Sequence, residues 1–126
     1  MKNAEYRIEK HQMIPFQLTD WEVPIATLTV TTKQPNKRVR LTCEIGWSKP
    51  HTADLGELEI VIRQSSGTGA ELFRESEMCH WNAMMTMDCE IAIPIAGTYT
   101  YYMNAVSVGR RAILNGPIYW YEASNS

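Results

Sequence analysis

The stretch from Met84 to Ala123, MMTMDCEIAIPIAGTYTYYMNAVSVGRRAILNGPIYWYEA, decides the fold class of this chain. Two segments within it alternate strictly between residues of two kinds, which is typical of strands with one face against a core. The turn Pro94-Ile95-Ala96-Gly97 joins these segments, and a last strand follows around Gly116-Pro117. The stretch therefore predicts an antiparallel β-domain.

The alternation also predicts which side chains face the core. The inward set comprises Met85, Met87, Cys89, Ile91 and Ile93 before the turn, and Tyr99, Tyr101, Met103 and Ala105 after it. The residues between them are expected on the outer faces of the two strands, because successive side chains of a strand point to opposite sides.

The rest of the chain repeats this organisation. Further strands are predicted over residues 23–32, 39–47, 57–63 and 70–76, with turn-forming residues at 33–36 and 65–69. No stretch has a convincing helical period. Counting residues 1–20 as an N-terminal arm or edge strand, the chain has about eight strands, which favours an all-β, antiparallel two-sheet sandwich that is jelly-roll-like. The sandwich is expected to span residues 21–123, with a short tail at 124–126.

Length and charge limit the classes of function. A chain of 126 residues fits one domain, and its formal net charge of -2 gives no electrostatic reason to expect nucleic acid as a partner. The first ten residues alternate in charge and lack the apolar core of a signal peptide, and no apolar run reaches membrane-spanning length. We therefore expect synthesis in the cytoplasm and no membrane span.

The three cysteines cannot all pair within one chain. Cys43 and Cys89 occupy inward positions of predicted strands, where a cysteine acts as a small buried hydrophobe. Cys79 lies in the segment Glu77–Asn82, which interrupts the alternation and reads as a connection with an accessible thiol. An intermolecular disulfide at Cys79, or an intramolecular one, is the alternative to three free thiols.

No group of residues has the spacing of a catalytic, metal or cofactor site. The three histidines are far apart in sequence, and adjacent Cys79 and His80 would point to opposite sides of an extended segment. Glu57 and Glu59 share a strand face with Arg63, as expected of a solvated strand. We therefore expect a protein that is not an enzyme and has no metal and no cofactor.

Aromatic residues provide the alternative to a purely structural role. Trp47 and Trp120 are expected in the core or in an interface, whereas Trp81 is the best candidate for an exposed ring. Exposed rings can stack on sugars. Trp81 therefore makes a carbohydrate-binding or receptor-binding module the alternative function.

Several segments of the sequence resemble a known family. They are Val23–Thr31, Gln34–Leu41, Gly46-Trp47, Glu57–Arg63, Pro94–Tyr101 and Gly116–Ile118. In this order they resemble the exosporium protein family, small β-sandwich proteins of the outer surface of bacterial endospores. This chain departs from the family in its three cysteines and in the longer connection from Glu77 to Asn82.

The resemblance implies a non-catalytic structural or anchoring protein of the spore surface that acts by self-assembly. It implies synthesis without a signal peptide in a mother cell, with release by lysis, and contacts with copies of itself and with other surface-layer proteins. Jelly rolls of this kind resemble the tumour necrosis factor fold, which implies a homo-oligomer such as a trimer. The expected self-assembly surfaces are the arm with Ile14, Phe16 and Leu18, and an aromatic face near Tyr102, Tyr119 and Tyr121.

Overall fold

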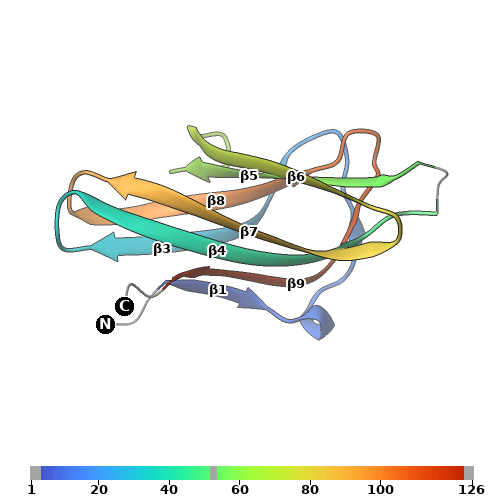
Figure 1. Cartoon of the computed structure of the whole chain (residues 1–126), viewed down its shortest axis with the longest axis horizontal. Helices are drawn as coiled ribbons and strands as arrows, with labels where there is room; N and C mark the ends of the chain where they lie inside the picture. The colour runs from blue at the N-terminus through green and yellow to red at the C-terminus, as the bar shows by residue number, and fades with distance from the viewer. Residues whose placement is uncertain (1–3, 52–53, 124–126) are drawn as a thin grey trace.

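The computed structural model describes residues 4–51 and 54–123, and the tail expected at 124–126 lies outside this part. Nine strands and one short 3-10 helix form within the described residues (Figure 1). Their bounds are β1 Glu5–Ile8, η1 Lys10–Gln12, β2 Phe16–Gln17, β3 Val23–Thr32, β4 Lys37–Ser48, β5 Gly56–Gln64, β6 Glu71–Cys79, β7 Asn82–Ile93, β8 Gly97–Val106 and β9 Ile113–Glu122. The predicted all-β class is confirmed, with the arm contributing β1 and β2.

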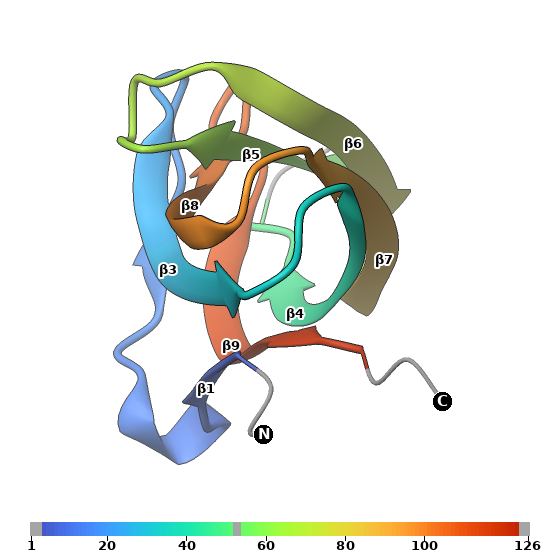
Figure 2. The ribbon, with the colours of Figure 1, turned by 90° about the vertical axis from the view of Figure 1, so that its left-hand side faces the viewer.

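The strands form two antiparallel sheets that pack face to face (Figure 2). The first sheet has the order β1-β9-β4-β7, with β2 also paired to β9, and the second has the order β3-β8-β5-β6. The pairs β2·β9, β3·β8, β4·β7 and β5·β6 are nested, so the chain runs as one long hairpin whose tip is the β5–β6 turn. Rolling this hairpin into two layers gives the jelly-roll arrangement.

The core consists of the inward side chains of both sheets, as the alternation predicts. Every residue of the predicted inward sets of β7 and β8 is buried or packs against the core. Trp47 and Trp120 are buried in it as well, which confirms their placement in the core. Burial of such large side chains supplies about 2 to 3 kcal/mol each, and provides the main driving force for joining the two sheets.

Two glycines allow the first sheet to close around the arm. A β-carbon at Gly46 in β4 would collide with the backbone of Gly116 in β9, and one at Gly116 would collide with the Met13 side chain. Gly116 also has a positive φ of 79°, which disfavours other residues. The close approach of β4 and β9 therefore depends on the missing side chain at Gly46, and the backbone conformation of β9 favours glycine at position 116.

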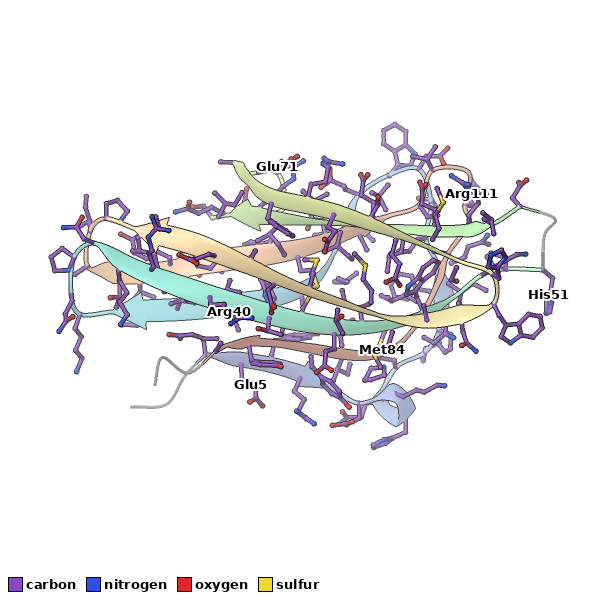
Figure 3. All side chains as sticks on the ribbon, viewed as in Figure 1. Glu5, Arg40, His51, Glu71, Met84 and Arg111 are labelled. Atoms are coloured by element: carbon purple, nitrogen blue, oxygen red, sulfur yellow. The ribbon has the colours of Figure 1, made fainter. Side chains whose placement is uncertain are left out.

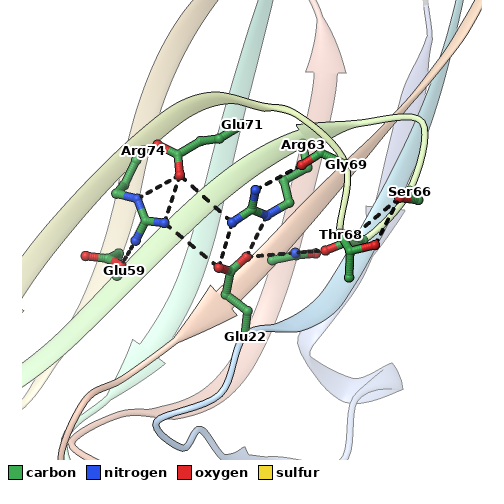
Figure 4. Close-up of polar contacts among 10 residues, drawn as sticks. Glu22, Glu59, Arg63, Ser66, Thr68, Gly69, Glu71 and Arg74 are labelled. Atoms are coloured by element: carbon green, nitrogen blue, oxygen red, sulfur yellow. Dashed lines mark hydrogen bonds and ion pairs between the residues drawn. The ribbon is translucent and has the colours of Figure 1, made fainter.

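A network of charged side chains lies over the outer face of the second sheet (Figure 4). Glu22 accepts two hydrogen bonds from the Arg63 guanidinium, from Nε and Nη2, each at 2.9 Å. Arg74 pairs with Glu59 and Glu71 in the same network. Glu22 also accepts a hydrogen bond from the buried Asn104 amide at 2.9 Å. The network thus ties the segment before β3 to strands β5, β6 and β8.

The pKa of Glu22 is lowered to about 2, mainly because the Arg63 guanidinium donates hydrogen bonds to its carboxylate. A carboxylate whose pKa is lowered on folding stabilises the folded state above the unfolded pKa, and this contribution is lost as the pH falls through the folded value. The relevant window therefore runs from the ordinary value of 4.5 down to about 2.

We expect the substitution Glu22→Gln to lower the free energy of unfolding at neutral pH by about 1 to 2 kcal/mol, because a bidentate, partly buried ion pair is lost. The difference from the unsubstituted protein should shrink between pH 4.5 and 2, where Glu22 becomes protonated. Urea unfolding at a series of pH values measures both effects. Glu90→Gln is the matched control, because the Arg38–Glu90 pair is largely exposed and its loss should cost clearly less than the loss of the Glu22–Arg63 pair. Equal costs for the two substitutions would contradict the assignment.

Candidate functional site

The turn between β6 and β7 presents Trp81 to solvent. β6 ends at Cys79 and β7 begins at Asn82, so only His80 and Trp81 form the connection. The Trp81 carbonyl accepts a hydrogen bond from the Lys49 backbone N–H at 2.9 Å, which holds the turn against the end of β4. The Trp81 side chain is nevertheless 71% exposed, as its sequence context predicts. The ring is therefore accessible while the backbone that carries it is fixed.

Trp81 lies at the rim of a surface pocket of about 710 Å³. The pocket is built where the end of β4 meets the start of β7 and the start of β9. Its lining residues are Ser48, Lys49, Pro50, His51, His80, Trp81, Asn82, Ile113 and Asn115. Figure 3 shows His51 at the right-hand end of the long axis, beyond the end of β4. The pocket thus occupies one end of the sandwich.

The pocket lining combines aromatic rings with amide and hydroxyl groups. The rings of His51 and Trp81 meet edge to face, with centroids 6.3 Å apart and planes at 77°. Asn115 Nδ2 donates to Ser48 Oγ at 3.0 Å, so these two polar groups hold each other in place. None of the lining residues that the structure describes is acidic. Such a surface suits a neutral or anionic ligand that offers both an apolar face and hydroxyl groups.

The structure corrects the expected position of Cys79. The alternation predicts a long connection from Glu77 to Asn82, but β6 continues to Cys79, which pairs with Gly56 of β5. The Cys79 side chain is only 9% exposed and packs in the core, so it is not the accessible thiol that the sequence suggests. The sequence predicts this strand only over residues 70–76, because β6 is largely exposed on both faces and its last residues show no alternation.

The other two cysteines are buried as predicted. Burial raises the pKa of Cys43 to about 12 and that of Cys89 to about 11. Burial also raises the pKa of Cys79. All three thiols are free. Within the described residues, no group of three or more His, Cys, Asp or Glu side chains could hold a metal ion.

The arm packs against its own chain. β1 pairs with the C-terminal half of β9, from Ile118 to Tyr121. β2 pairs with the first two residues of β9, Ile113 and Leu114. Leu18, expected in a self-assembly surface, is 1% exposed because it packs in the core. Ile14 remains 87% exposed, and Phe16 is partly exposed. The prediction of a contact surface on the arm is therefore wrong for Leu18 and stays a prediction for Ile14 and Phe16.

The three tyrosines expected on one aromatic face lie on different sheets. Tyr102 is on β8, whereas Tyr119 and Tyr121 are on β9, and all three are half-buried on the outer faces. Tyr119 already contacts its own chain, since it donates to Glu9 Oε2 at 2.5 Å and lies 4.1 Å below the Arg7 guanidinium. The prediction of one common surface is wrong because β8 and β9, although consecutive, belong to opposite layers.

Sequence reasoning found Trp81 but missed the groups beside it. Ser48, His51 and Asn115 meet Trp81 only because β4 pairs with both β7 and β9. No spacing rule links positions so far apart in sequence, and only the strand order reveals that they share a pocket.

Comparison with known proteins does not assign this chain to a family. No protein-family model matches the sequence, and no curated protein matches it. The part of the chain that the structure describes contains no helix with the length and apolar character needed to cross a bilayer. The class that the structure defines is an antiparallel β-sandwich of jelly-roll topology with an aromatic pocket at one end.

We expect all three thiols to react slowly in the folded protein, because burial hides them and raises their pKa. Alkylation with iodoacetamide at neutral pH, followed by intact-mass measurement, should give little modification in buffer. The same treatment in guanidinium chloride, as the control, should modify all three cysteines. Rapid modification of Cys79 in the folded protein would restore the accessible thiol that the sequence suggests.

Proposed function

We propose that this protein is a non-catalytic binding module that attaches to a carbohydrate through the pocket around Trp81. The single observation that supports this most strongly is an indole ring that is 71% exposed at the rim of a pocket of about 710 Å³. Covering a tryptophan ring with an apolar sugar face removes a large apolar area from water. The ring therefore supplies the affinity in this proposal.

The polar residues of the pocket lining orient the sugar in this proposal. Ser48, Asn82 and Asn115 offer hydroxyl and amide groups, which can both donate and accept hydrogen bonds. Sugar hydroxyls have the same dual capacity, so these groups match them. Lys49 adds a cation that favours an anionic sugar over a cationic one.

We expect Trp81→Ala to weaken glycan binding by about tenfold or more, as for other exposed aromatic anchors of binding sites. A glycan array that includes bacterial surface polysaccharides identifies the ligand, and calorimetric titration measures the loss. Trp21→Ala is the matched control, because Trp21 is 79% exposed but is not part of the pocket lining. Binding that survives Trp81→Ala, or a folded protein that binds no glycan of the array, would contradict the proposal.

We propose as a second function a structural or anchoring role in a bacterial spore surface layer, acting by self-assembly. The resemblance to exosporium proteins motivates it, and it includes cytoplasmic synthesis without a signal peptide. One structural observation supports self-assembly: strand β3 ends the second sheet and carries no charged residue. Uncharged edge strands are templates for pairing with another chain. A glycan-binding pocket is compatible with this role, since anchoring needs an attachment surface.

Native mass spectrometry of the purified protein, with and without reductant, tests self-assembly. We expect an oligomer whose size does not change on reduction, because the three cysteines are free and buried. A monomer under both conditions would contradict self-assembly. An oligomer that dissociates on reduction would instead assign the contact to an intermolecular disulfide.

A further inference from the structure

The four edges of the two sheets differ in charge. The charged residues on three edge strands are Glu5 and Arg7 on β1, Glu71, Arg74, Glu75 and Glu77 on β6, and Asp88 and Glu90 on β7. Charges on an edge strand oppose pairing with a further strand. The fourth edge strand, β3, has the sequence VPIATLTVTT and no charge over its ten residues. The two-residue strand β2 beside β9 is also uncharged, so β3 is the one edge strand longer than two residues, among the described residues, that lacks this protection.

The direction of the β3 backbone groups follows from its neighbour. Thr100 of β8 accepts a hydrogen bond at its carbonyl from the Ser65 N–H, which lies directly after β5. The N–H and C=O of one residue in an antiparallel strand point to the same side, so those of Thr100 point toward β5. Thr29 faces Thr100 in the register and forms a pair without backbone hydrogen bonds. The N–H and C=O of Thr29 therefore point to the open edge.

The two-residue repeat of the strand extends this result to Thr27 and Thr31. The carbonyl of Ile25 accepts a hydrogen bond from the Tyr6 hydroxyl at 3.3 Å, so the arm covers the start of the edge. No described residue forms a backbone hydrogen bond with Thr27, Thr29 or Thr31 on the open side. The open part of the edge thus runs from Ala26 to Thr32.

The threonine side chains of β3 already form pairs with threonines of its neighbour β8. Thr29 Oγ1 lies 3.4 Å from Thr100 Oγ1, and Thr31 Oγ1 lies 3.0 Å from Thr98 Oγ1. These hydroxyls cover the outer face beside the edge, while Leu28 and Val30 point into the core. A strand added to β3 would therefore meet neutral, β-branched side chains, which favour cross-strand pairing.

We infer that the open edge of β3 binds β3 of a second copy of this chain, antiparallel across a two-fold axis at Thr29. In this register Thr29 faces Thr29 of the other copy, and Thr27 faces Thr31. All the outward backbone groups of these three threonines then find partners. A register centred on Leu28 would instead bring Thr31 opposite Ile25, whose carbonyl is already bonded to Tyr6.

This inference deepens the proposal of self-assembly by naming its surface and its partner. The β3-β8-β5-β6 sheets of the two copies would join into one continuous antiparallel sheet. Threonines would line the outer face of this sheet at the junction. An edge contact of this length is small, so the dimer should be weak and depend on protein concentration. A two-fold contact closes on itself and gives a dimer, not an open filament.

The test is a substitution at the axis. In Thr29→Lys the two lysines face each other, so sedimentation velocity over a concentration series should show the dimer dissociation constant raised by at least about tenfold. Thr98→Lys is the matched control, because this exposed threonine lies on the same outer face but one strand away from the edge. The control should keep the dimer. Thermal unfolding of both variants checks that they fold.

A mixture of Thr29→Lys with Thr29→Glu tests the register itself. Each variant should be monomeric alone, and the mixture should form a heterodimer, because opposite charges then face each other across the axis. If the single variants are monomeric and the mixture stays monomeric, the two-fold register is overturned. If the unsubstituted protein forms an oligomer that Thr29→Lys leaves intact, this edge is overturned while self-assembly stands. A monomer at all concentrations overturns both.

Discussion

The pairing of β4 with β7 over their full length of twelve residues is the constraint on which the other parts of the structure depend. It places Ser48 opposite Asn82, so the turn that carries Trp81 is held at the end of β4. Because β4 also pairs with β9, the same strand brings Asn115 to that end of the sandwich. The pocket is therefore a product of strand register, although the pocket residues come from three distant parts of the chain.

Alternation along the sequence was sufficient to predict the fold class and most of the core. It identified the inward faces of β7 and β8, because each of these strands has one face toward the core and one face that is more exposed. It could not assign strands to sheets, since a period of two residues carries no information on which layer a strand joins. The family resemblance implies one surface for Tyr102 and Tyr119, and alternation offers no check on this, whereas the structure places them in different sheets.

Edge strands were the hardest elements to read from sequence. β6 is largely exposed on both faces, so the sequence predicts the strand over 70–76 but assigns its last residues to a connection. Its buried last residue, Cys79, therefore resembles an accessible thiol. The prediction for Leu18 has the opposite error. Leu18 alternates in sequence with Ile14 and Phe16, which are exposed, so the pattern does not show that Leu18 alone is buried. Trp81 was identified correctly because a tryptophan between polar residues in a turn seldom finds room in a core.

The nested strand order also constrains how this chain can reach its folded state. The β5–β6 hairpin joins segments that are close in sequence, whereas β9 pairs with β1 and β2, which lie about a hundred residues earlier. During synthesis the early strands therefore remain incompletely paired until β9 has left the ribosome. Leu18 and the edge of β4 that pairs with β9 are uncovered during this time. Domains dominated by such distant pairings fold slowly and expose apolar surface while they do so. In this chain the surfaces that wait longest for a partner are therefore the arm and the edge of β4, because β9 covers both.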